Sequence, residues 1–126
     1  MSPARRPPVF FNLFLIRLPI AGVMSIIHRA SGALMVLAIP ALLYLLERSL
    51  SGPEGFAEVA ALFTGRFGEA LLFVALWALL HHLYAGIRYL LIDLEIGVDR
   101  PAYRYTAWLV TLAAPVTALL LAGGLA

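Results

Sequence analysis

Cysteine and lysine are both absent from this chain of 126 residues. Without cysteine, the chain cannot form a disulfide, a zinc–thiolate site, a cysteine nucleophile or an iron–sulfur cluster from its own side chains. Charged residues are scarce, at 13%, whereas hydrophobic residues make up 63% of the sequence and the mean hydropathy is +0.95. A soluble domain of this length is too small to bury so much apolar surface. The composition therefore indicates an integral membrane protein.

The apolar residues gather in three stretches, each as long as the ~20 residues that a helix needs to cross the hydrocarbon core of a bilayer. We predict an all-α fold with three transmembrane helices, at about residues 21–48, 67–94 and 104–126. In this interpretation the whole chain, 1–126, is one membrane domain. Residues 1–20 combine arginines with phenylalanines, which predicts a short segment lying along the membrane surface.

The arginines also predict an orientation, because positive charge near the ends of membrane spans stays preferentially in the cytoplasm. Three arginines precede the first predicted helix, and Arg100 and Arg104 lie after the second. The loop between these helices has two arginines against four glutamates. We expect the N-terminus and the second loop in the cytoplasm, and the C-terminus outside. The absence of a transit peptide favours a bacterial inner membrane over a mitochondrial one. No basic run is interleaved with exposed aromatic residues, so nucleic acid is not an expected partner.

Ionisable residues interrupt two of the three predicted spans. The first contains His28 and Arg29, and the second contains His81, His82 and Arg88. Such groups cost several kcal/mol at the depth of lipid tails, so they usually face a cavity, a cofactor or a charge partner. At 1.5 Å per residue, Arg29 and His82 both lie ~15 Å from the cytoplasmic ends of their helices. The matched depth predicts one shared site between the two helices.

Helical spacing places these residues on defined faces. One stripe of the first predicted helix holds Ser25, His28, Arg29 and Gly32. One stripe of the second holds His82, Gly86, Tyr89 and Asp93. Residues spaced three and four apart share a helix face, and a glycine such as Gly86 lets a flat macrocycle or another helix approach closely.

A histidine beside a glycine within the membrane is suited to binding haem iron, and a haem's two propionates need cationic partners. Adjacent helical residues point about 100° apart, so we expect only one of His81 and His82 to be the axial ligand. The spacing to Gly86 favours His82. His28 and Arg29 are candidate propionate partners, and Arg88 is a possible third. The alternatives are that a histidine bonds only to a neighbouring helix, and that Arg88 is an interfacial cap.

A hydroxyl at Ser25, one turn from Arg29, could hydrogen-bond a quinone carbonyl, and the arginine could stabilise charge as the quinone is reduced. The alternative for Ser25 is a bond to its own helix backbone, which is common in membranes.

Five segments resemble the cytochrome b556 subunit family of succinate dehydrogenase: RP at 6–7, IRLP at 16–19, SIIHRASG at 25–32, SLSGPEGF at 49–56, and HLYAGIR at 82–88 followed by Asp93. The resemblance implies a membrane anchor of respiratory complex II. It implies Ser25 and Arg29 at a quinone site, His82 as one axial ligand of haem b, and His28 and Arg29 near the propionates. Tyr89 departs from the family pattern, because many members have histidine at this position.

The resemblance further implies partners: a second anchor subunit supplying the other axial histidine and sharing the haem, an iron–sulfur subunit and a flavoprotein subunit. The expected activity is electron transfer to ubiquinone, or to menaquinone, within succinate:quinone oxidoreductase. The chain alone has no flavin fingerprint and no cluster ligands, so it cannot oxidise succinate by itself. Two alternatives are a haem-free structural anchor and the anchor of a fumarate reductase.

Overall fold

The computed structural model describes residues 17–125, and all of the regular structure in that range is helical. The helices, in chain order, are α1 (Ile20–Leu50), α2 (Pro53–Leu62), α3 (Gly65–Asp93) and α4 (Arg100–Leu125). Three of them, α1, α3 and α4, are long and apolar enough to cross a membrane. This confirms the all-α fold with three transmembrane helices. The predicted interfacial segment, 1–20, falls almost entirely outside the described residues.

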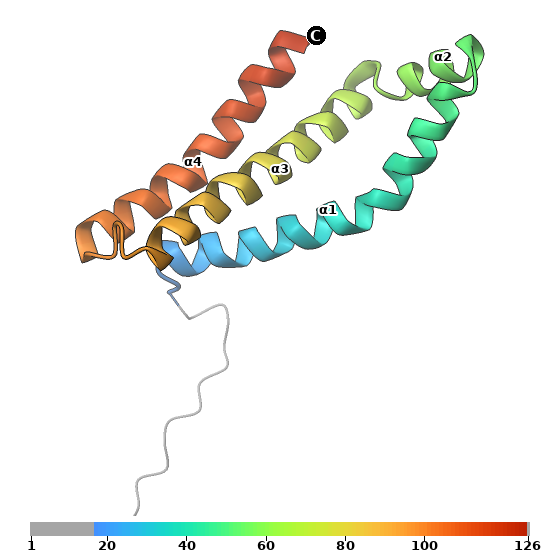
Figure 1. Ribbon diagram of the computed structural model, residues 1–126. Coiled ribbons are helices and arrows are strands. Elements are labelled where there is room, and N and C mark those ends of the chain that lie inside the picture. The colour runs from blue at the N-terminus through green and yellow to red at the C-terminus, as the bar shows by residue number, and fades with distance from the viewer. Residues whose placement is uncertain (1–16, 126) are drawn as a thin grey trace, which may run out of the picture.

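The long helices form a bundle in which α3 packs against both α1 and α4 (Figure 1). Small residues line the contact, which lets the helix backbones approach closely. The fully buried ones are Ala78 and Ala85 of α3 and Ala107, Ala114 and Ala118 of α4. Met24 of α1 completes a core cluster with Ala85, Ala107 and Val110.

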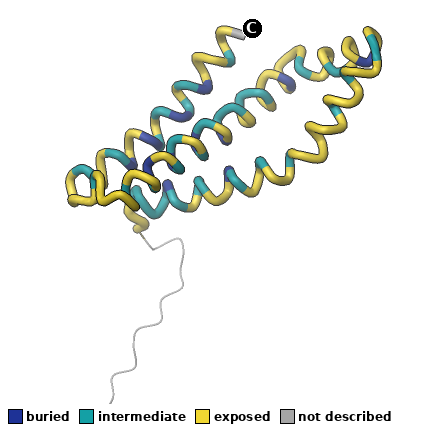
Figure 2. Tube along the Cα trace, viewed as in Figure 1, coloured by how far each residue is buried: buried dark blue, intermediate teal, exposed yellow. Residues whose placement is uncertain are grey.

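The share of residues that are buried within the chain differs strongly between the three long helices. In the most apolar part of α1 only 6% of residues are buried within the chain, against 17% in α3 and 22% in α4. Figure 2 shows the same contrast as a long exposed tract along α1, whereas buried residues gather where α3 meets α4. The exposed side chains are mainly leucine, isoleucine and valine, so α1 presents its apolar surface to lipid or to another membrane subunit.

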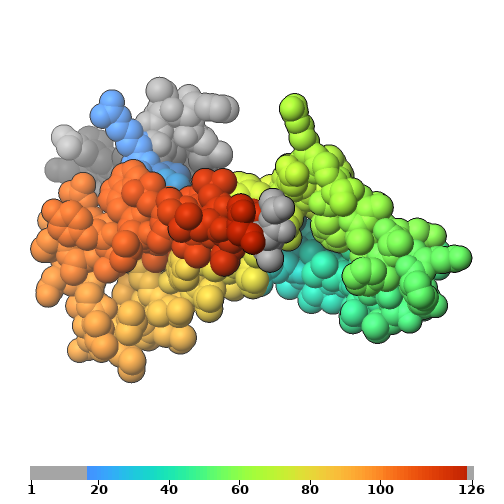
Figure 3. All heavy atoms as spheres, turned by 90° about the horizontal axis from the view of Figure 1, so that it is seen from above, coloured from blue at the N-terminus to red at the C-terminus, as the bar shows by residue number. Residues whose placement is uncertain are grey.

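The short helix α2 caps one end of the bundle and folds back on the end of α1. Arg48 donates from Nε and Nη2 to the carboxylate of Glu58 at 2.8 and 2.7 Å. A side chain at Gly55 would collide with the backbone carbonyl of Arg48, so glycine is needed for this close approach. In the space-filling view, α2 and the adjoining end of α1 lie at the opposite end from the start of α4 (Figure 3).

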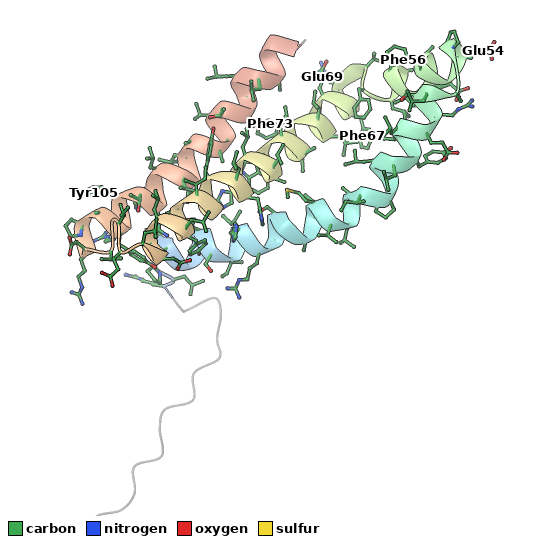
Figure 4. All side chains as sticks on the ribbon, in the orientation of Figure 1. Glu54, Phe56, Phe67, Glu69, Phe73 and Tyr105 are labelled. Carbon is green, nitrogen blue, oxygen red and sulfur yellow. The ribbon has the colours of Figure 1, made fainter. Side chains whose placement is uncertain are left out.

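Glu54 and Glu69 lie at the α2 end, and Tyr105 lies at the other end (Figure 4). The α3–α4 loop at that other end turns through Glu95 and Gly97, whose φ angles are 62° and 77°.

One boundary differs clearly from the sequence-based expectation. Helix α4 begins at Arg100 rather than near 104. Pro101 falls in the first turn, where a missing N–H costs nothing, and the Tyr103 N–H donates to the Asp99 carbonyl at 2.8 Å. Pro40 lies inside α1, and the second half of that helix turns toward α2 (Figure 1).

Candidate functional site

His82 of α3 faces α1 and stacks on His28. The two ring centroids are 4.2 Å apart and the ring planes differ by 19°. The Nδ1 of His82 lies 3.1 Å from the His28 backbone carbonyl and 3.4 Å from the Ser31 hydroxyl. A carbonyl can only accept a hydrogen bond, so Nδ1 carries the proton and Nε2 holds the ring's free lone pair.

The Nε2 atom of His82 makes no hydrogen bond to any residue between 17 and 125. Three other histidine nitrogens in that range are buried without a hydrogen-bond partner, namely Nε2 of His28 and both ring nitrogens of His81. His82 is only partly buried and its Nε2 is not among these atoms, so this nitrogen is not sealed by the packed helices. Because Nδ1 carries the proton and Nε2 keeps its lone pair, His82 can bind a metal through Nε2.

Gly32 makes the approach of His82 to α1 possible. A Cβ at Gly32 would lie 2.8 Å from Cε1 of His82 and 3.1 Å from its Nδ1. Both distances are too short for ordinary packing. At Gly86, which the sequence singled out as the open position, the corresponding Cβ would have only His28 Nε2 nearby, at 3.9 Å. Of the two glycines beside His28 and His82, Gly32 is therefore the sterically demanding one.

Other members of the predicted stripe on α3 also face His28. The Tyr89 ring lies 5.3 Å from the His28 ring in a tilted arrangement. The structure thus brings His28, His82, Gly86 and Tyr89 together at the α1–α3 contact.

His81 points elsewhere, although it is adjacent to His82 in the chain. Its side chain is completely buried and lies 6.1 Å from the Trp77 ring. Neither of its ring nitrogens has a hydrogen-bond partner in the described part of the chain. The two histidines therefore occupy different environments, one inside the bundle and one at the α1–α3 contact.

Arg88 is directed toward α4. Its Nε donates to the Thr106 hydroxyl at 3.0 Å, and its Nη2 donates to the Tyr103 carbonyl at 2.9 Å. The guanidinium also lies 4.5 Å from the centre of the Tyr103 ring. Arg88 thereby ties the end of α3 to the first turns of α4, and it is only 4% exposed. The structure does not place it in the group around His28 and His82.

The Ser25 hydroxyl makes no hydrogen bond within residues 17–125. Every other described serine or threonine hydroxyl bonds to a backbone carbonyl three or four residues earlier. The alternative for Ser25, a hydrogen bond from its hydroxyl to its own helix backbone, is therefore not seen among the described residues. Arg29 is exposed, and its Nε donates to the Ser25 carbonyl at 3.3 Å.

Ser25 lines a cavity of about 770 Å³ at the end of the bundle where α1 and α4 begin. Tyr89 of α3 and Tyr103, Arg104 and Trp108 of α4 also contribute to its walls. Sequence reasoning missed the α4 residues because they lie in or beside a segment expected to be a loop. It also missed Ser31, which a spacing of three residues from His28 could have indicated.

Comparison with known proteins decides the family. Residues 3–121 match the family described as succinate dehydrogenase/fumarate reductase transmembrane subunit. The chain belongs to this family. The succinate dehydrogenase cytochrome b556 subunit of Coxiella burnetii is 33% identical over 117 residues, which cover 92% of this chain and 93% of the relative. That of Paracoccus denitrificans is 32% identical over 92 residues, covering 73% and 71%.

The side chains of this chain can be compared with the ligands that haem iron requires. Among the described residues, no three histidine, cysteine, aspartate or glutamate side chains gather as a metal cage. Haem needs only one axial side chain from each flanking element, because the porphyrin supplies the other four ligands. His82, with its Nδ1 proton fixed by a carbonyl and its Nε2 accessible, fits that requirement.

Proposed function

We propose that this chain is the haem b-containing anchor subunit of a succinate:quinone oxidoreductase, with His82 as an axial ligand of the haem. The observation that carries the proposal is the hydrogen bond between His82 Nδ1 and the His28 carbonyl. Histidines that ligate metals commonly donate their other ring N–H to a carbonyl, which fixes the ring and raises its basicity. When bound, haem b supplies a one-electron carrier within the membrane.

His28 and Arg29 are the proposed partners of the haem propionates. The His28 Nε2 atom is buried without a hydrogen-bond partner among residues 17–125, and leaving such a group unsatisfied costs about 1–3 kcal/mol. A carboxylate arriving with a cofactor would satisfy it. Arg88 is a weaker candidate for this role, since Thr106 and Tyr103 already occupy two of its donors.

The second axial ligand is proposed to come from a companion anchor subunit. Within residues 17–125 neither of the other two histidines is placed to be this second ligand. His28 stacks on His82, and His81 is buried inside the bundle. The exposed apolar surface of α1 is suited to packing against a second set of membrane helices. Iron–sulfur and flavoprotein subunits complete the proposed complex, because this chain has no cysteine for cluster ligation.

Ser25 and Arg29 are the proposed contribution to the quinone site. The Ser25 hydroxyl is free to donate to a quinone carbonyl, and it opens into a cavity large enough for a quinone ring. Arg29 stands one turn away with most of its guanidinium donors unused. A positive charge held near the carbonyl oxygen stabilises the anion that forms during reduction.

The proposed orientation places the start of α1 and the α3–α4 loop on the cytoplasmic face of a bacterial inner membrane. Arg17 lies just before the start of α1, and Arg100 and Arg104 lie in the first turns of α4. Glu54 and Glu69 lie at the α2 end (Figure 4). The cavity beside Ser25 then faces the side on which soluble subunits would deliver electrons.

The proposal is tested on the purified complex. A pyridine haemochrome spectrum is expected to show b-type haem, and a colourless complex would support a purely structural anchor instead. Ser25→Ala is expected to lower quinone reduction by succinate while dye reduction by succinate continues. The matched control is Ser49→Ala, which also removes a hydroxyl from α1, at the far end of the helix. Equal quinone reduction in both variants would remove Ser25 from the site.

A further inference from the structure

Ser31 forms a small polar cluster with the two histidines at the α1–α3 contact. Its side chain is almost completely buried, at 2% exposure. Its Oγ donates to the His28 carbonyl at 2.9 Å and lies 3.4 Å from His82 Nδ1. The same carbonyl lies 3.1 Å from that Nδ1. Three polar atoms thus meet in a contact that is otherwise apolar.

The proton positions follow from the chemistry of each group. The His28 carbonyl has no proton, so the hydrogen bond from Ser31 must use the Ser31 hydroxyl proton. The lone pairs of Ser31 Oγ are then left facing the N–H of His82 Nδ1. That N–H is shared between two acceptors, the carbonyl and the hydroxyl oxygen, in a three-centre hydrogen bond of the kind seen where acceptors crowd one donor.

We infer that Ser31 is a positioning residue for the proposed haem ligand: its hydroxyl oxygen helps to orient the His82 ring and increases the electron donation of its Nε2. This inference rests on the proposed function, because it concerns His82 as a ligand. An acceptor at Nδ1–H makes an imidazole more basic, and a more basic axial ligand stabilises oxidised iron. Ser31 therefore lowers the reduction potential of the haem.

Gly32 and Ser31 act together in this arrangement. Gly32 lets the ring come close to α1, since any Cβ there would overlap Cε1 of His82. Ser31, one position earlier, then lies within reach of the ring's Nδ1. Adjacent positions on α1 thus provide the space for His82 and a polar contact that orients it.

The test is a redox titration of the haem in the purified complex carrying Ser31→Ala. The expected result is an upward shift of the midpoint potential, accompanied by changed EPR g-values of the oxidised haem, because one acceptor is lost. The control is Ser49→Ala. Ser49 also donates to the carbonyl three residues earlier, at 2.8 Å, but it lies far from any histidine. A potential in Ser31→Ala that is unchanged, lowered or shifted no more than in Ser49→Ala overturns the inference.

Two further variants separate the possible failures. If Ser31→Ala does not assemble, Ser31→Thr, which keeps the oxygen, is expected to assemble with the unaltered potential, and a shifted potential in it counts against the inference. His82→Ala is measured in parallel. If His82→Ala keeps a normal b-type spectrum, the proposed function fails. If it loses the spectrum while Ser31→Ala behaves like Ser49→Ala, only the role of Ser31 fails.

Discussion

Two faces of helix α3 each carry a histidine, and these faces differ in burial and in hydrogen bonding. The core stripe consists of Ala78, His81, Ala85 and Arg88, which are all buried. The α1 stripe consists of His82, Gly86 and Tyr89, which face His28. Among residues 17–125, the His81 ring has no hydrogen-bond partner, whereas His82 has two acceptors near Nδ1.

The difference shows how one step along a helix can change the chemistry of identical side chains. His81 is enclosed by packed neighbours, so neither nitrogen can reach an incoming ligand. His82 is anchored through one nitrogen and accessible through the other, which is what an axial ligand requires. Substitutions on each face test this difference.

The largest effect is expected from the histidines themselves. His82→Ala should abolish or strongly reduce b-type haem in the purified complex, because it removes the only accessible Nε2 of the cluster. His81→Ala should retain the haem, measured by the pyridine haemochrome spectrum per mole of complex. Equal haem content in the two variants would contradict the assignment of different roles to the two faces.

A large effect is also expected from Gly32→Ala. The added methyl would lie 2.8 Å from Cε1 of His82, so the ring must leave its place against α1. We expect lower haem content or an altered haem spectrum, read by optical and EPR spectroscopy. The matched control is Gly123→Ala in α4, where an added Cβ meets nothing within 4 Å. A normal spectrum in Gly32→Ala would show that the contact between Gly32 and His82 is dispensable.

An intermediate effect is expected from Arg88→Met, which keeps the length of the side chain but removes its charge and donors. Two hydrogen bonds join Arg88 to α4, and a hydrogen bond to a charged group contributes about 1.5–3 kcal/mol. The denaturation temperature of the complex should fall while the haem potential stays the same. A shift in potential with unchanged stability would instead place Arg88 near a propionate.

A smaller effect of opposite sign is expected from His81→Leu. A buried imidazole without partners costs about 1–3 kcal/mol, and leucine fills a similar space without polar atoms. Thermal denaturation of the complex should occur at an equal or higher temperature than in the unaltered protein. A clear decrease would mean that another subunit or a bound water satisfies His81 in the complex.

The smallest effect is expected far from both faces, at Glu58→Gln. The ion pair between Arg48 and Glu58 is solvent-exposed, with side-chain exposures of 43% and 61%. Exposed pairs contribute about 0–1 kcal/mol. Haem content, potential and quinone reduction should remain unchanged, and denaturation should shift by little. A change in the haem would show that the α2 end is coupled to the candidate site.

Several features could be predicted from the sequence because they depend on local composition and helical spacing. The three long apolar helices followed from the length of the apolar stretches, and the grouping of His82, Gly86 and Tyr89 followed from their spacing along one helix. The segment 100–103 was wrongly expected to be a loop, because Pro101 reads as a break unless it falls in a first turn.

The candidate site was predicted less completely. Gly86 stood out beside His82 in the sequence, but Gly32 is the glycine that contacts the ring. The sequence does not show whether Arg88 lies near a propionate or against a neighbouring helix. Only the contacts of its side chain with Tyr103 and Thr106 show that it binds α4. These are contacts between helices, and periodicity within one helix does not reveal the rotation of its neighbour.

Apolar length and helical spacing are enough to define a three-span helical membrane protein with imidazole and guanidinium groups at matched depth. Which histidine is sealed and which is anchored and accessible depends on how the helices pack, because the rotation of α3 between α1 and α4 sets the environment of each side chain. The backbone carbonyl of His28, which has no signature in the sequence, selects the tautomer of His82.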